Sequence, residues 1–221
     1  TAHRQTMRRL VIDSATEACS VALFEDNALI AGEFRLLGRG HAEALVPMIA
    51  ALPEHGRADS IAVALGPGSF TGIRVGLAAA RALAFAWGAE LTGYPTLDLV
   101  AAQARDTQEA GEWAVAMTGG HGEWFVQSFD AQGAALGPVA SLSPETAARS
   151  VTAARIAGSQ AEALVRLRGQ GDALAVLPDA RCFALLPPAA HTADIRPLYG
   201  RAPDARLPGG AAPRFAPGAA G

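Results

Sequence analysis

The 221-residue sequence predicts an α/β fold, with mixed sheets flanked by helices and the same arrangement used twice. Short β-rich runs open the chain and are joined by tight polar turns, which favours an antiparallel meander. An apolar run at 61–65 then leads through a glycine-rich loop into an alanine-rich helix. Weaker strand and helix patterns follow in the second half of the chain. Residues 7–102 and 103–199 are therefore each expected to form one subdomain.

The meander is predicted from three runs near the N-terminus. Residues 10–13, 19–24 and 28–34 are rich in apolar and β-favouring side chains. Polar segments at 14–18 and 25–27 separate these runs and have the composition of tight turns. Strands joined by such short turns pair with their neighbours, so we expect three consecutive antiparallel strands.

A first helix is predicted at 41–52, where apolar residues recur along one stripe. Pro47 lies inside this helix and removes one backbone hydrogen bond, which predicts a kink. The apolar stripe consists of Leu45, Met48, Ile49 and Leu52.

The strongest helical pattern runs from residue 73 to residue 87 and is apolar around most of its circumference. Such a helix is either buried on both sides or shared with a partner. One face carries Ile73, Leu77, Ala80, Ala84 and Trp87, and the other carries Val75, Ala79, Ala82 and Phe85. Small residues recur every four positions, which allows close approach of another element within the chain or on a partner. This small-residue ridge consists of Gly72, Gly76, Ala80 and Ala84.

The second half gives weaker signals. Helices are predicted at 97–105, 144–149 and 159–168, and strands at 113–117, 123–129 and 155–157. Three strands, a helix, a strand and a helix in the first half form the order of the ribonuclease-H-like unit found in actin-like ATPases and sugar kinases. Two such units in tandem predict a duplicated actin-like fold with mixed sheets. Residues 200–221 are dominated by Pro, Gly and Ala, which predicts a disordered tail.

The most specific segment is the glycine loop at 66–76, GPGSFTGIRVG. Its glycines permit backbone conformations and close approaches that a side chain forbids. Its hydroxyls can cap the following helix, whose free N–H groups attract anions, and an arginine follows in the first turn. The loop either contacts a nucleotide phosphate or is a tight strand-to-helix turn, and it matches neither G-x-G-x-x-G nor a Walker loop. The candidate residues are Gly66, Gly68, Ser69, Thr71, Gly72 and Arg74.

Composition excludes several functional classes. The net charge of -3 and the lack of a basic stripe give no support to direct tRNA binding. No apolar run is long enough for a membrane span, and no signal-peptide core opens the chain, so we expect a soluble cytoplasmic protein. Cys19 and Cys182 have neither a metal spacing nor a disulfide framework and are expected to be reduced thiols. The five histidines form no close pair, so no metal site is predicted.

Three motifs, in this order and spacing, resemble the TsaB (YeaZ) family. They are LVIDSATEACSVAL at 10–23, HAEALVPMI at 41–49 and the glycine loop. The likeness covers the first half strongly, and the second half adds mainly the RPLY sequence at 196–199. The chain departs from the family at 118–121, where TGGH replaces an Asp-Ala-Arg-like turn.

The resemblance implies a non-catalytic scaffold or activator in the complex that adds threonylcarbamoyl to the adenosine 3′ of the tRNA anticodon. The catalytic TsaD subunit would be its partner, and the TsaE ATPase would join the complex. The chain would take part in tRNA binding only indirectly. A homodimer would use a similar surface. TsaD holds metal with paired histidines, whereas the matching stretch at 94–98 here has none. No cofactor is expected on this chain alone, with ATP or ADP allowed at a subunit junction. The implied interface is Leu45, Met48, Ile49, Leu52, Val75, Ala79, Ala82 and Phe85.

A second hypothesis stays open beside the scaffold. The chain would be an autonomous enzyme, either an actin-like ATPase or a metallopeptidase-like protein. In the ATPase form, Asp13 at the end of the first predicted strand would lie near nucleotide-bound magnesium, with Ser69 and Thr71 near phosphate.

Overall fold

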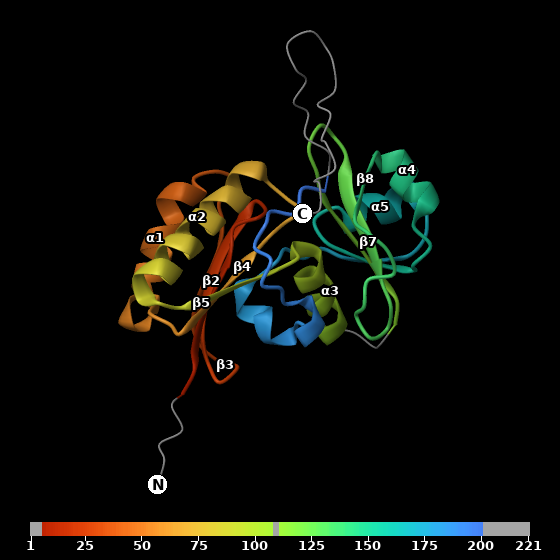
Figure 1. The fold of residues 1–221 in the computed structure, drawn as a ribbon. Coiled ribbons are helices and arrows are strands. Elements are labelled where there is room, and N and C mark those ends of the chain that lie inside the picture. Colours follow the sequence, from red (N-terminus) through yellow and green to blue (C-terminus); the bar gives the residue numbers. More distant parts are fainter. Residues whose placement is uncertain (1–5, 108–110, 201–221) are drawn as a thin grey trace, which may run out of the picture.

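Each half of the chain forms its own five-stranded sheet, and the two sheets are the centres of two neighbouring lobes (Figure 1). The structure is a computed structural model that describes residues 6–107 and 111–200. The predicted disordered tail from residue 201 onward lies outside the described residues.

The first lobe contains the predicted meander. Its strands are β1 (Arg8–Asp13), β2 (Ala18–Glu25), β3 (Ala28–Leu36), β4 (Ser60–Ala64) and β5 (Glu90–Tyr94). β1, β2 and β3 pair antiparallel, whereas β4 pairs parallel to β1 and β5 parallel to β4. The strand order is β3-β2-β1-β4-β5, so the sheet is mixed and β1 lies at its centre.

Two helices pack together on one side of this sheet, α1 (His41–Ala51) and α2 (Phe70–Trp87) (Figure 1). A short 3₁₀ turn, η1 (Pro53–Gly56), follows α1. At the start of α2 the side chain of Ser69 accepts a hydrogen bond from Gly72 N at 3.2 Å, as predicted for a cap. The helix ends at Gly88, whose positive φ provides a left-handed C-terminal cap.

The second lobe repeats the first in topology. Its strands are β6 (Trp113–Thr118), β7 (Trp124–Phe129), β8 (Ala140–Leu142), β9 (Arg155–Ala157) and β10 (Asp172–Leu174). Written from the same edge as the first sheet, the strand order is β8-β7-β6-β9-β10. β8, β7 and β6 pair antiparallel, whereas β9 pairs parallel to β6 and β10 parallel to β9, as in the first sheet. The helices are α4 (Pro144–Ser150) and α5 (Ala161–Arg168). The predicted duplication is therefore present.

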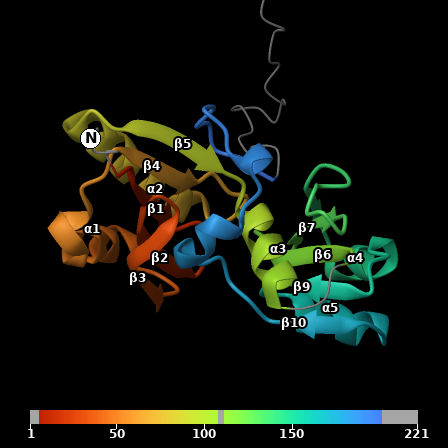
Figure 2. The same ribbon diagram turned by 90° about the horizontal axis from the view of Figure 1, so that it is seen from below.

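Helix α3 (Thr96–Thr107) lies between the lobes and contributes to both cores (Figure 2). Leu97 and Val100 pack in the core of the second lobe, whereas Leu99 and Ala102 pack in that of the first. The expected subdomain boundary at 102/103 thus falls inside one helix that both lobes share.

The chain does not stay in the second lobe after β10. Its 3₁₀ turns η2 (Ala180–Leu185) and η3 (Pro188–Ala190) lie against the first lobe, where Phe183 packs on Phe24 and Tyr94. Further along, the amide of Leu198 donates to Leu65 O at 2.8 Å. Residues 180–199 therefore complete the first lobe, although they follow the second in the sequence.

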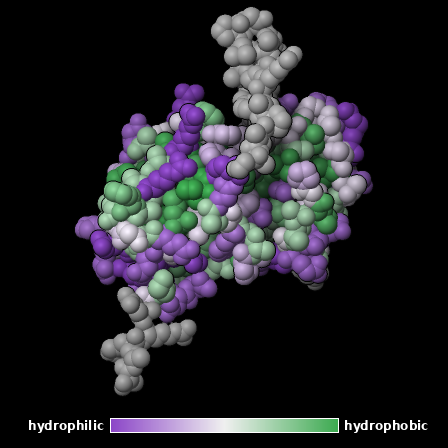
Figure 3. Space-filling model, in the orientation of Figure 1, coloured by the Kyte–Doolittle hydropathy of each residue, from purple (hydrophilic) through white to green (hydrophobic). Residues whose placement is uncertain are grey.

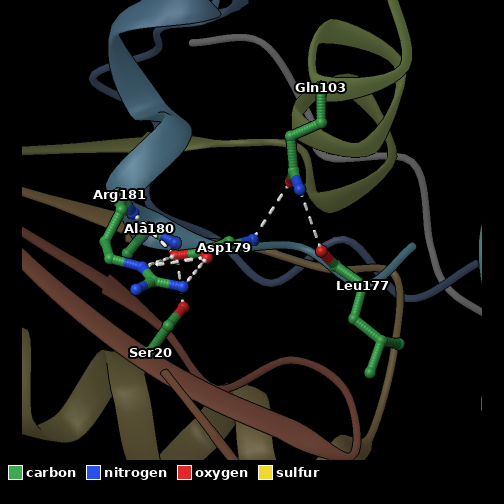
Figure 4. Close-up of polar contacts among 6 residues, drawn as sticks. All are labelled: Ser20, Gln103, Leu177, Asp179, Ala180 and Arg181. Atoms are coloured by element: carbon green, nitrogen blue, oxygen red, sulfur yellow. Dashed lines mark hydrogen bonds and ion pairs between the residues drawn. The ribbon is translucent and has the colours of Figure 1, made fainter. Parts of the chain in front are cut away.

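Polar contacts fix the point where the chain crosses back (Figure 4). Gln103 of α3 donates to Leu177 O at 3.1 Å and accepts from Asp179 N at 3.1 Å. The amide of Ala180 donates to Ser20 Oγ of β2 at 2.9 Å. These bonds satisfy polar groups in a part-buried crossing and fix its path.

We expect Phe183→Ala to lower the free energy of unfolding by about 3–5 kcal/mol, because a buried ring in a packed core is removed. Denaturant unfolding measures this. Leu167→Ala, on the exposed side of α5, is the control and should change stability by less than about 0.5 kcal/mol. Equal losses for the two variants would show that the returning segment does not contribute to the first core.

Candidate functional site

A cleft of about 610 Å³ lies between the lobes. The β1–β2 turn and the glycine loop form its wall on the first lobe, and the β6–β7 turn forms its wall on the second. Tyr199 and Gly200, at the end of the described chain, complete it. Gly38, between β3 and α1, also lines the cleft, so segments far apart in the sequence meet at one site.

The glycine loop packs directly on the backbone of the β1–β2 turn. The amide of Ser69 donates to Ala15 O at 2.7 Å, and Ser14 Oγ donates to Gly72 O at 2.8 Å. A Cβ at Gly68 would come within 3.0 Å of Ala15 O, and one at Gly72 within 3.0 Å of Ser14 O. These two glycines are required because another backbone of the same chain approaches closely.

The predicted loop residues do not all face the cleft. Gly68 and Ser69 line it, whereas Gly66 and Gly72 are buried and do not. Thr71 is exposed in the first turn of α2 and does not line the cleft.

Arg74 also lies outside the cleft, with its guanidinium 3.9 Å from the ring centre of Phe70. Phe70 itself lines the cleft and packs against the ring of Tyr199 at 5.3 Å. The arginine thus stacks on an aromatic ring, which is a common structural use of a guanidinium.

The TGGH segment at 118–121 forms the wall on the second lobe. Its conformation is supported by the two residues that precede α5, Ser159 and Gln160. Thr118 N donates to Ser159 Oγ at 3.0 Å, and Gln160 Nε2 donates to Thr118 Oγ1 at 2.9 Å. Sequence reasoning missed three apolar lining residues: Met117, Phe125 and Tyr199. Of these only Tyr199 gave a signal, as part of RPLY near the chain end.

Asp13 does not line the cleft. Its carboxylate is buried and accepts hydrogen bonds from Ala15 N at 3.1 Å and from the Tyr94 hydroxyl at 3.2 Å. Burial raises the pKa of Asp13 from 3.8 to about 7, against the lowering effect of these two bonds. The hypothesis that Asp13 serves nucleotide-bound magnesium has no support in this geometry, because the carboxyl group faces the core.

The expected partner face needs correction. The apolar stripe of α1 packs against the sheet of its own lobe and is almost fully buried, so it is not available to a partner. The residues concerned are Leu45, Met48, Ile49 and Leu52. The predicted small-residue ridge is internal as well. A Cβ at Gly76 would lie 2.5 Å from Ser14 Oγ beneath α2.

Other apolar side chains remain exposed on the outer face of α1 and α2. Phe85 is 92% exposed and Val46 is 61% exposed. Ala82 is also exposed, whereas Val75 and Ala79 are half-buried against the first core. Figure 3 shows hydrophobic residues on this side of the first lobe. Val46 was missed because the helical stripe around Leu45 dominated the pattern.

The described residues contain no group of three or more His, Cys, Asp or Glu side chains placed to hold a metal ion. Likewise, in the described part of the chain no helix has the length and apolar character to cross a membrane. Cys19 and Cys182 are both free thiols, and burial raises the pKa of Cys19 to about 11. That thiol therefore stays protonated and unreactive at neutral pH.

The two lobes of matching topology, the shared helix and the intervening cleft define a duplicated actin-like protein. The family model described as TsaD, tRNA N6-adenosine threonylcarbamoyltransferase, matches residues 35–168. The structure of YeaZ from Pseudomonas aeruginosa superposes with a TM-score of 0.74 at 28% identity, over 87% of this chain and 99% of that one. The chain belongs to the TsaB (YeaZ) family.

Curated relatives match over shorter stretches. The tRNA threonylcarbamoyladenosine biosynthesis protein TsaB of Escherichia coli is 46% identical over 90 residues, which is 38% of each chain. The protein of the same name in Haemophilus influenzae is 40% identical over 106 residues, or 44% of this chain and 42% of the relative. The chain thus covers about two fifths of the length of these relatives.

Gly72→Ala should lower the free energy of unfolding by about 1–3 kcal/mol, because the new methyl group collides with the carbonyl of Ser14. Thermal and urea unfolding measure the loss. Gly137→Ala is the matched control, since a Cβ there meets nothing within 4 Å. If Gly72→Ala were as stable as this control, the contact between loop and turn would not be close.

Asp13→Asn should flatten the pH dependence of stability. The folded chain holds the Asp13 proton up to about pH 7, whereas the unfolded chain loses it near 3.8, so wild-type stability falls as pH rises between these values. The variant should escape this loss, which is up to about 1.4 kcal/mol per pH unit. Urea unfolding across this range measures it, with exposed Asp172→Asn as the control. Parallel curves for Asp13→Asn and wild type would contradict the shift.

Proposed function

We propose that this chain is a non-catalytic scaffold subunit of the complex that adds threonylcarbamoyl to the adenosine 3′ of the tRNA anticodon. Its partner is the TsaD catalytic subunit, and the TsaE ATPase belongs to the same complex. The chain takes part in tRNA binding only indirectly. The matched family model carries the TsaD description, and two relatives carry the name of a biosynthesis protein for this modification. The free thiols accord with action in the reducing cytoplasm.

The exposed apolar face of α1 and α2 is the observation that carries this proposal. Phe85 is almost fully exposed on α2, beside exposed Ala82, and Val46 is exposed on α1. Covering an exposed apolar side chain with a partner stabilises the complex by about 25 cal/mol for each Å² of apolar surface removed from water. Large apolar side chains exposed on two packed helices are typical of a protein contact surface. The same face would serve a homodimer.

The geometry of the glycine loop favours the scaffold function over the hypothesis of an autonomous ATPase. Its close approaches are to the backbone of Ser14 and Ala15, and Asp13 faces the core. The exposed groups at the start of α2, Thr71 and Arg74, would contact ATP or ADP only at a junction with another subunit. Such a partner would supply the further cations that a polyphosphate needs.

Phe85→Asp should weaken binding to the TsaD subunit at least about tenfold, because a charge replaces a central apolar contact. Surface plasmon resonance with purified TsaD measures the affinity, and a reconstituted tRNA modification assay measures the consequence. Leu167→Asp makes the same kind of change at an exposed leucine on α5 of the other lobe and should bind normally. Normal TsaD binding by folded Phe85→Asp would rule out this face.

A further inference from the structure

A second, smaller pocket lies at the opposite end of β1 from the cleft. Arg8 begins β1 and lines this pocket, whereas the cleft is lined by residues that follow Asp13, the last residue of the strand. The pocket has a volume of about 320 Å³, which is at the lower end of the range of ligand sites and suits a small molecule. Two arginines, two carboxylates and a tryptophan line it, namely Arg8, Arg57, Glu54, Asp59 and Trp87.

One wall of this pocket comes from a left-handed turn. Glu54 and His55 have φ of 51° and 55°, and Gly56 follows with φ of 71°. Consecutive left-handed residues that carry a Cβ are costly, and such conformations cluster at sites that hold a ligand. The turn places the Glu54 carboxylate on the Arg8 guanidinium, with Oε2 and Nη1 2.7 Å apart. A strained backbone therefore fixes one carboxylate at the pocket.

The start of β1 fixes the second carboxylate. Arg8 N donates to Asp59 Oδ2 at 2.9 Å, and Asp59 N donates to Arg8 O at 3.0 Å. Among the described residues, none donates a hydrogen bond to the other oxygen, Asp59 Oδ1. The Arg8 guanidinium is already neutralised, because Glu54 and Glu25 both form ion pairs with it. Asp59 thus keeps a held carboxylate oxygen that is free to accept from a ligand.

Arg57 supplies an unpaired cation. It is exposed, and its side chain forms no hydrogen bond or ion pair with any residue that the structure describes. Asp59 lies only two positions further along, beyond buried Ala58, yet the two charges do not pair with each other. A simple anion at this pocket would meet the carboxylates, and a simple cation would meet the guanidinium groups. A ligand that carries both charges complements both.

The apolar part of the pocket is Trp87, near the end of α2. This residue is half-buried and packs against the core of the first lobe. An indole held by a core keeps its position before a ligand arrives, and it offers a large apolar surface to a ligand side chain.

We propose that this pocket binds an α-amino acid with an apolar side chain. Its carboxylate pairs with Arg57, its ammonium group pairs with Asp59, and its side chain packs against Trp87. The site lies within one chain, is separate from the cleft, and does not rest on the proposed scaffold function.

Calorimetric titration of the isolated full chain with three matched ligands tests the proposal. Leucine carries both charges, isocaproate lacks only the ammonium group of leucine, and isoamylamine lacks only its carboxylate. Leucine should bind at micromolar to millimolar concentration, and each analogue at least about tenfold more weakly, because each loses one ion pair. No binding of leucine at millimolar concentration, or binding of either analogue as tight as that of leucine, would overturn the proposal.

Two substitutions that remove a charge locate the site. Arg57→Gln removes the unpaired guanidinium, and Asp59→Asn removes the negative charge but keeps an oxygen for the Arg8 amide. Each should weaken leucine binding at least about tenfold, and Arg57→Gln should also reduce the preference for leucine over isoamylamine. Arg39→Gln is the matched control, since Arg39 is an exposed arginine outside the pocket. Leucine binding that survives in folded Arg57→Gln would place the ligand elsewhere.

Because the titration uses no partner, its outcome is independent of the TsaD binding experiment. Loss of leucine binding in Arg57→Gln together with normal TsaD binding would separate this pocket from the outer helix face.

Discussion

The close contact between the β1–β2 turn and the glycine loop is the constraint on which the first lobe and the cleft depend. Two hydrogen bonds hold it, from Ser69 N to Ala15 O and from Ser14 Oγ to Gly72 O. Gly68 and Gly72 allow the backbones to approach because they have no side chain. The contact sets where α2 begins, and therefore where its outer face points and where Phe70 meets the cleft.

The second constraint is the path of the chain between the lobes. Helix α3 shares its buried residues between two cores, and the segment after Leu177 returns to the first lobe. This return brings Tyr199 beside Phe70, although 129 positions of sequence separate them by their numbering. The outer helix face and the cleft are consequently two distinct surfaces of the same molecule.

Apolar periodicity made most of the fold predictable, because long elements repeat their pattern over several turns or residue pairs. The meander, α1, α2, α3, β6 and β7 were all predicted close to their observed bounds. Strands β5, β8 and β10 were not predicted. β8 and β10 have three residues each and neither is fully buried, so they leave little periodic pattern. The exposed side of α1 was also missed. Leu45 and Val46 are adjacent and both apolar, and periodicity alone does not reveal which neighbour the sheet covers.

The sequence by itself determined the family, the duplicated α/β architecture and the need for glycine in the loop at 66–76, because these follow from local patterns and motifs. The tertiary structure alone decided what those glycines approach, which apolar residues remain in water and which segments share the cleft. These properties depend on contacts between residues far apart in the chain, such as Ala15 with Ser69 and Phe70 with Tyr199. Burial and close approach are properties of the packed molecule, and a one-dimensional pattern does not contain them.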